Sequence, residues 1–84
     1  MKLIKNVLMF ERRPDTKYLM PSNFQIRAGA EIQVVFGTEE VRMPNGALCE
    51  KRVACFQTAD GMDYYLLVEE MGETESVVLT GTHQ

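Results

Sequence analysis

The chain alternates between short runs of apolar and β-branched residues and breaks made of glycine, proline, asparagine or aspartate. From residue 17 onward the apolar positions lack helical periodicity, and Val, Ile, Phe, Tyr and Thr dominate the runs, which is typical of strands. Apolar and polar positions alternate from Phe24 to Ala28, the chain turns near Gly29, and the alternation resumes from Ala30 to Phe36. This pattern predicts a mainly β domain.

Two hairpin turns are predicted, at Asn45-Gly46 and at Asp60-Gly61. A two-residue type I′ turn needs positive φ at both central residues, and these dipeptides tolerate that conformation best. Taken as two-residue turns, they fix a register on both sides of residues 47–57. On one side the predicted pairs are Met43 with Leu48, Glu40 with Lys51, Glu39 with Arg52, Phe36 with Cys55 and Val35 with Phe56. On the other side they are Phe56 with Tyr65, Cys55 with Leu66, Val53 with Val68, Arg52 with Glu69 and Lys51 with Glu70.

The charges along these strands support the register, although they were not used to derive it. Lys51 and Arg52 fall between Glu39-Glu40 on one neighbouring strand and Glu69-Glu70 on the other. Opposite charges that face each other across strands stabilise a sheet by roughly 0.2–1 kcal/mol each. Residues 47–57 are therefore predicted to form the middle strand of an antiparallel meander.

The N-terminus has two readings. A short helix would gather Leu3, Ile4, Val7 and Leu8 on one face. A buried strand would use the apolar run from Val7 to Phe10, and it is preferred because Pro14 limits a helix to a marginal length.

The predicted fold is all-β within a single domain, residues 1–84. A further strand is expected at Ser76–Thr80, which is rich in β-branched residues. The architecture is expected to be a small antiparallel barrel or roll of about six short strands, SH3-like or OB-like in size. A three- to four-stranded meander over residues 31–80 forms its basis.

Both faces of the predicted meander are apolar. In the derived register one of them carries Val35, Phe56, Tyr65, Ala54 and Leu67. An antiparallel sheet usually keeps one face in water, so the second face has to be covered by the N-terminal strands or by another molecule. Phe56, Tyr65 and Leu67 are therefore candidate partner-binding residues.

The small size of the domain raises the question of what stabilises it. A chain of 84 residues buries only about 63% of its unfolded surface. Cys49 and Cys55 would lie roughly 20 Å apart on one strand, too far for a disulfide. One histidine, His83, cannot complete a zinc site with them, and Asp60 with Asp63 gives calcium too few oxygens. No metal or cofactor is expected, which leaves self-association.

The location of the protein is predicted from two further features. The N-terminal apolar run is only four residues long, nothing resembles a signal peptide, and no segment approaches the length of a membrane span. Two cysteines that cannot pair within the chain fit a reducing compartment. A soluble cytoplasmic protein is expected.

Charge is unevenly distributed along the chain. Residues 1–30 carry six bases and two acids, a balance of +4, whereas residues 31–84 carry three bases and ten acids, a balance of −7, which sums to −3. The simplest interpretation is that a basic N-terminal segment packs beside an acidic meander. The alternative is that Arg12, Arg13 and Lys17, in "ERRPDTK", bind phosphate or an acidic partner.

The preferred functional interpretation is a non-enzymatic protein-interaction module that forms homo-oligomers. One alternative is a barrel that binds single-stranded nucleic acid or a phosphate ligand through Arg12 and Arg13. A pI near 5.0 argues against nucleic acid, because contacts to phosphates supply much of the affinity.

A further alternative is an acidic inhibitor of a basic, nucleic-acid-binding protein. The carboxylates available for this role gather toward one end of the predicted meander: Glu39, Glu40, Glu69, Glu70, Glu73 and Glu75. Catalysis is not expected, because the sequence has no phosphate loop, no Ser-His-Asp constellation and no metal motif.

Overall fold

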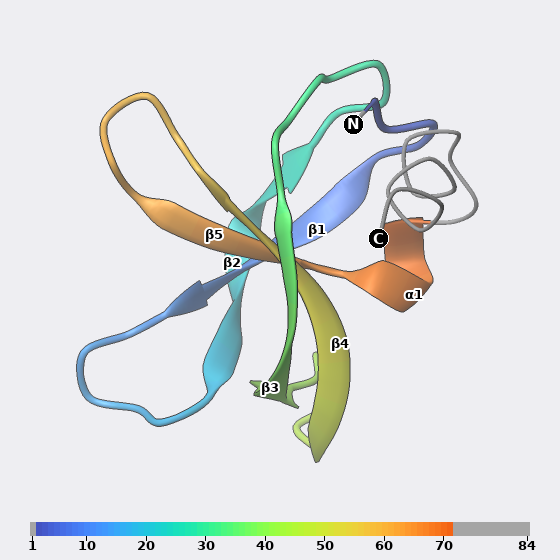
Figure 1. Cartoon of the computed structure of the whole chain (residues 1–84). Helices are drawn as coiled ribbons and strands as arrows, with labels where there is room; N and C mark the ends of the chain where they lie inside the picture. Colours follow the sequence, from blue (N-terminus) through green and yellow to red (C-terminus); the bar gives the residue numbers. More distant parts are fainter. Residues whose placement is uncertain (1, 72–84) are drawn as a thin grey trace.

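A computed structural model of the chain describes residues 2–71, which form one small β-barrel (Figure 1). Its strands are β1 (Val7–Arg12), β2 (Leu19–Ile26), β3 (Val35–Arg42), β4 (Leu48–Gln57) and β5 (Asp63–Leu67), followed by a one-turn helix, α1 (Val68–Met71). The predicted all-β small barrel is confirmed, but it is not antiparallel throughout as predicted, because β2 and β3 are parallel. The described residues contain five strands, and the further strand predicted at Ser76–Thr80 lies outside them. The strand reading of the N-terminus is also correct.

The number of strands sets the topology of the ring. Neighbouring strands can all be antiparallel in a closed ring only if their number is even, so a ring of five needs one parallel pair. That pair is β2 and β3, which meet at Leu19 and Val41, while the other neighbours are antiparallel. Parallel neighbours require a crossover connection, and residues 27–34 provide it.

The crossover is fastened to the start of the chain. The N–H of Leu3 donates to the carbonyl of Ala30 at 3.0 Å, and the N–H of Gly29 donates to the carbonyl of Leu3 at 2.7 Å. The side-chain oxygen of Asn6 accepts the N–H of Ala28 at 2.8 Å. These bonds hold the N-terminal segment and the crossover together against the sheet.

The predicted two-residue turns are wrong, because each hairpin has a three-residue loop. In the β3–β4 hairpin, the N–H of Met43 donates to the carbonyl of Ala47 at 2.7 Å. The N–H of Gly46 donates to the carbonyl of Met43 at 2.8 Å. Gly46 has φ +93°, so the loop is a type I turn closed by a glycine bulge. The β4–β5 loop repeats this arrangement between Thr58 and Met62, with Gly61 at φ +86°.

Each predicted pair is consequently displaced by one residue. Between β3 and β4 the observed partners are Val35 with Cys55, Phe36 with Ala54, Thr38 with Arg52, Glu39 with Lys51 and Glu40 with Glu50. Between β4 and β5 they are Val53 with Leu67, Ala54 with Leu66, Cys55 with Tyr65 and Phe56 with Tyr64. The acids predicted to face the bases from the third strand lie in α1 instead, although Glu69 still reaches Lys51 at 2.9 Å.

Both faces of the sheet are covered within the chain. The five-strand cluster takes one buried residue from each strand: Phe10, Leu19, Val41, Val53 and Leu67. On the opposite face, the N-terminal cluster consists of Leu3, Val7, Ala54, Phe56, Leu66 and Met71, with Ile32 and Val34 of the crossover packed against it. The first of the two predicted ways to cover the second apolar face is therefore the one observed.

The two loop glycines should be sensitive to substitution, and Gly37 offers a matched control. An alanine at Gly46 or Gly61 would have to adopt positive φ, which costs about 1–2 kcal/mol. At Gly37, in the middle of β3, an added Cβ meets nothing within 4 Å and the backbone is extended. We expect Gly46→Ala and Gly61→Ala to lower the free energy of unfolding by that amount and Gly37→Ala to leave it unchanged or raise it by about 0.5 kcal/mol. Urea unfolding measures all three, and equal losses would contradict the assigned loops.

Candidate interaction groove

The residues predicted to form one contact surface do not lie together. Phe56 is 7% exposed in the N-terminal cluster, whereas Leu67 is 2% exposed in the five-strand cluster on the other face. Tyr65 is half-buried opposite Cys55 and Phe10. The prediction that these three residues share a face is wrong, because the one-residue shift in register moves Phe56 to the opposite side. Phe56 and Leu67 offer little surface to a partner.

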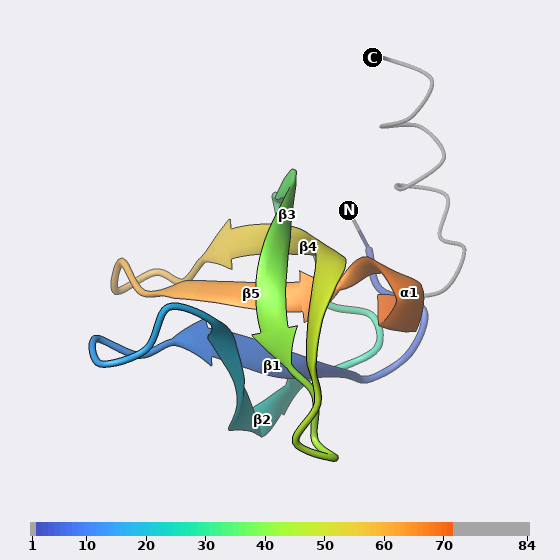
Figure 2. The same cartoon turned by 90° about the horizontal axis from the view of Figure 1, so that it is seen from below.

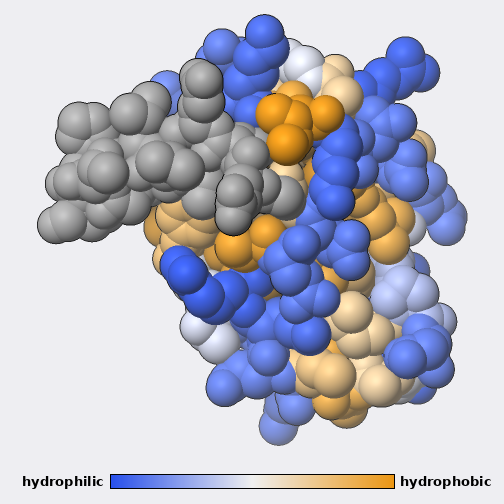
Figure 3. Space-filling model, turned by 90° about the vertical axis from the view of Figure 1, so that its right-hand side faces the viewer, coloured by the Kyte–Doolittle hydropathy of each residue, from blue (hydrophilic) through white to orange (hydrophobic). Residues whose placement is uncertain are grey.

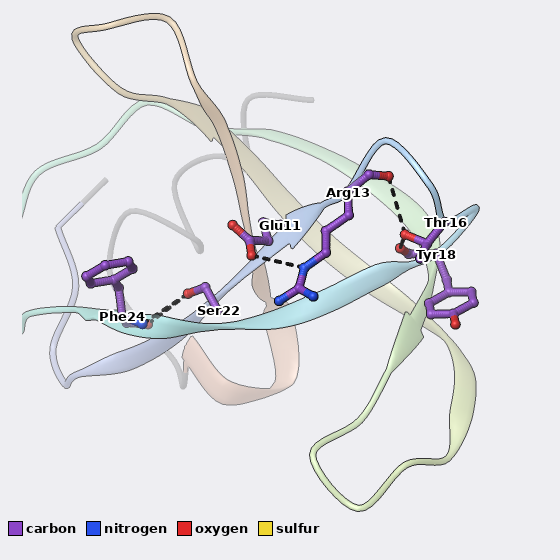
Figure 4. Close-up of polar contacts among 6 residues, drawn as sticks. All are labelled: Glu11, Arg13, Thr16, Tyr18, Ser22 and Phe24. Atoms are coloured by element: carbon purple, nitrogen blue, oxygen red, sulfur yellow. Dashed lines mark hydrogen bonds and ion pairs between the residues drawn. The ribbon is translucent and has the colours of Figure 1, made fainter.

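The bases of the predicted phosphate site lie beside carboxylates. Arg12 contacts Glu39 at 2.7 Å and lies 5.7 Å over the ring centre of Tyr65. Its hydrogen bonds, first to Glu39 and then to Tyr65, raise the pKa of Arg12 above its ordinary value. Arg13 contacts Glu11 at 3.4 Å (Figure 4). The ion pair between Arg12 and Glu39 is one case of the predicted packing of the basic N-terminal segment against the acidic meander.

The loop between β1 and β2 is held by its own hydrogen bonds. The hydroxyl oxygen of Thr16 lies 3.0 Å from the carbonyl of Tyr18 and 3.4 Å from that of Arg13 (Figure 4). The N–H of Thr16 also donates to the carbonyl of Arg13, at 3.2 Å. The phenol oxygen of Tyr18 accepts a bond from Arg42 at 3.2 Å. Polar groups near the proposed phosphate site therefore serve to fix the loop.

The described residues do not bring together the side chains that nucleophilic or metal chemistry would use. Cys49 and Cys55 are free and partly buried, and burial is the main cause that raises the pKa of the Cys55 thiol. Residues 2–71 contain no group of three or more His, Cys, Asp or Glu placed to hold a metal ion, and His83 lies outside them. No helix among the described residues is long and apolar enough to cross a bilayer.

A concave surface lies beside the parallel junction of β2 and β3. Past Leu19, β2 runs on to Ile26 with β1 on one side and no described strand on the other. At this edge a cavity of about 230 Å³ reaches the buried Phe10 and Leu67. Its lining is Asn6, Val7, Leu8, Phe10, Gln25, Met43, Pro44, Leu67 and Glu70.

A second, more open hollow of about 680 Å³ continues along β2. It is lined by Asn6, Leu8, Ser22, Asn23, Phe24, Gln25 and Arg27. Asn6, Leu8 and Gln25 line both hollows, so the two form one continuous depression. We call it the seam groove.

A bulge in β2 shapes the seam groove. Leu8 pairs with Gln25 and Phe10 pairs with Pro21, so residues 22–24 of β2 lie opposite one residue of β1. The hydroxyl oxygen of Ser22 accepts the N–H of Phe24 at 3.1 Å, and the ring of Phe24 stands off the strand (Figure 4). Phe24 is 62% exposed, so its ring is accessible from the groove. Bulges often redirect side chains near binding sites.

The exposed apolar residues elsewhere are scattered. Among the described residues, those outside the seam groove are Ile4, Val35, Leu48 and Met62. On the side of the molecule seen in Figure 3, apolar residues reach the surface as separate patches among charged ones. The seam groove differs from these positions because a cavity, an open strand edge and an exposed aromatic ring lie at one place.

Sequence reasoning did not identify the seam groove. Phe24 alternates with Ile26 and so reads as a core position, and the bulge that turns it outward depends on the pairing of β1 with β2. The cavity joins residues from four separate segments, which no local pattern links.

Comparisons with protein-family models, curated proteins and solved structures found no match for this chain. Function therefore has to be inferred from the geometry of the molecule itself.

The thiol of Cys55 provides a test of whether the barrel holds an activated nucleophile. A raised pKa lowers the thiolate fraction at a given pH, so we expect Cys55 in a Cys49→Ser variant to react with iodoacetamide more slowly when folded than when unfolded in urea at pH 7. The rate should rise with pH without a plateau below the pKa of an ordinary thiol, about 8.5. A folded protein that reacts faster than the unfolded one would contradict this and favour catalysis.

Proposed function

We propose that this chain is a non-enzymatic protein-interaction module that binds an extended segment of a partner protein in the seam groove and also forms homo-oligomers. The observation that carries the proposal is the open edge of β2 beside a cavity that reaches the five-strand cluster. A reducing, cytoplasmic location belongs to the same proposal, and the two free cysteines support it.

An open strand edge suits an extended peptide. It presents unpaired N–H and C=O groups that an incoming strand can bond, while pockets beside the edge select its side chains. Along β2 the exposed Asn23 and Gln25 add amide groups that can bond a peptide backbone. The β2 bulge limits the length of regular pairing, so the pockets would carry much of the selectivity.

The size and lining of the cavity indicate which side chain it takes. At about 230 Å³ it is smaller than the 300–1,000 Å³ typical of small-molecule sites. Its apolar lining combines the accessible Leu8, Met43 and Pro44 with the buried Val7, Phe10 and Leu67, and the charged residue in its lining is Glu70. A single apolar side chain next to a lysine or arginine matches this combination, because the base can pair with Glu70 at the mouth.

The two rival interpretations have weaker support. Arg12 and Arg13 would have to give up Glu39 and Glu11 to bind phosphate, and the loop that carries them is bonded to itself. An acidic surface for a basic partner is partly neutralised, because Glu39 pairs with Arg12 and Glu69 pairs with Lys51.

Selection from a library of random peptides tests the seam groove even though the partner is unidentified. We expect peptides enriched on the wild-type protein to share an apolar residue flanked by a base. They should bind a Glu70→Lys variant and a Phe24→Ala variant at least about tenfold more weakly, a loss of about 1.4 kcal/mol. Both residues are exposed, so the fold should survive.

Asp15→Lys is the matched control, since it reverses a charge in the β1–β2 loop away from the groove lining. Its affinity for the selected peptides should equal that of the wild type. Failure to enrich any peptide, or equal binding by all variants, would contradict a binding role for the seam groove.

A further inference from the structure

The first part of β3 has an open edge of its own. Residues 35–40 pair with β4 on one side, and β2 first meets β3 at Val41. No described strand lies beside residues 35–40 on their other side, and this part of β3 extends away from β2 (Figure 2). Val35 at its start is 74% exposed. A free edge of this length can add another strand.

The charges beside this edge are unmatched within the described chain. Glu40 lies directly opposite Glu50, and like charges in that position oppose strand pairing. Arg52 lies opposite Thr38 with its guanidinium 5.9 Å over the ring centre of Phe36, and no described carboxylate is within ion-pair distance of it. On the other face of the same strands, Glu39 has a base as its ion-pair partner, Arg12.

A second copy of the chain can supply the missing partners. In an antiparallel β3–β3 pair related by a two-fold axis at Thr38, Thr38 faces its own copy and Phe36 faces Glu40 of the other molecule. Directly opposite residues have their Cα atoms about 4.5–5.5 Å apart. The guanidinium of Arg52 already lies over Phe36, so it would meet Glu40 of the other copy, and symmetry gives this contact twice.

The register centred on Thr38 also matches the length of the open edge of β3. It pairs residues 36–40 with residues 40–36 and stops before Val41, which pairs with Leu19 of β2. It places Gly37 opposite Glu39 of the other copy, where open space around Gly37 leaves room for the ion pair of Glu39 with Arg12. An axis at Gly37 would instead put Glu40 opposite Val34, outside β3, and leave Arg52 unmatched.

We propose that two copies of this chain form a symmetric dimer through the open edge of β3, with Arg52 of each copy paired to Glu40 of the other. This interface rests on the self-association included in the proposed function and gives it a defined surface. It leaves the seam groove free, so each subunit of the dimer can hold a partner segment.

Charge reversal tests the interface in the full-length protein. Light scattering over a range of concentrations should show the wild type passing from monomer to dimer. Glu40→Arg and Arg52→Glu should each raise the dimer dissociation constant at least about tenfold, because each breaks two contacts and brings like charges together. The double variant should return it to within a few-fold of the wild-type value. Asp15→Arg, the same charge change in the β1–β2 loop, should have no effect.

The outcomes separate this interface from the proposed function. A wild type that stays monomeric would overturn both self-association and the β3 dimer, and a larger assembly would exclude a symmetric edge pair. A dimer unaffected by either single reversal would overturn the β3 interface while leaving self-association in place. Two weakened single variants that the double variant fails to restore would overturn the pairing of Arg52 with Glu40. Peptide binding that depends on Glu70 would still hold in each case.

Discussion

Five strands cannot close into a ring with every neighbour antiparallel, and this parity constraint governs the molecule. The one parallel junction falls between β2 and β3, and in the described structure it consists of the pair Leu19 and Val41. A parallel junction needs a crossover, and here residues 27–34 bond the N-terminal segment and help cover the second apolar face. The same junction leaves an edge of β2 on one side and an edge of β3 on the other without a described partner strand.

The two open edges differ in chemistry and so suit different partners. The β2 edge is bulged, carries the exposed ring of Phe24 and borders a cavity that leads to buried Phe10 and Leu67. The β3 edge is regular and is accompanied by an acid and a base, Glu40 and Arg52, that have no ion-pair partner among the described residues. The first edge fits a peptide that inserts a side chain, and the second fits a copy of itself. Neither role needs a reactive group.

Sequence patterns predicted the β class, the barrel, a strand at the N-terminus and the position of both hairpin loops, because these depend on local alternation and on turn residues. They did not predict the parallel junction, because the alternation from Ala30 to Phe36 indicates a strand directly after Gly29, whereas residues 27–34 form the crossover and β3 begins at Val35. They did not predict loop length, since Asn-Gly and Asp-Gly also occur in three-residue loops that end in a bulge. Charge gave false support, because Glu39 and Glu40 are adjacent and either register places an acid opposite Lys51. The one-residue error moved Phe56 to the wrong face. The seam groove depends on a bulge and on contacts between distant segments, which local patterns do not encode.

Amide hydrogen exchange of β3, followed by NMR at increasing protein concentration, tests the central claim most directly. If the parallel junction leaves β3 open, every second amide between residues 35 and 40, those pointing away from β4, should exchange as fast as loop amides in dilute protein. The same amides should become protected as the protein dimerises. Protection of these amides in the monomer would show that the edge is already covered within the chain, and it would contradict the account.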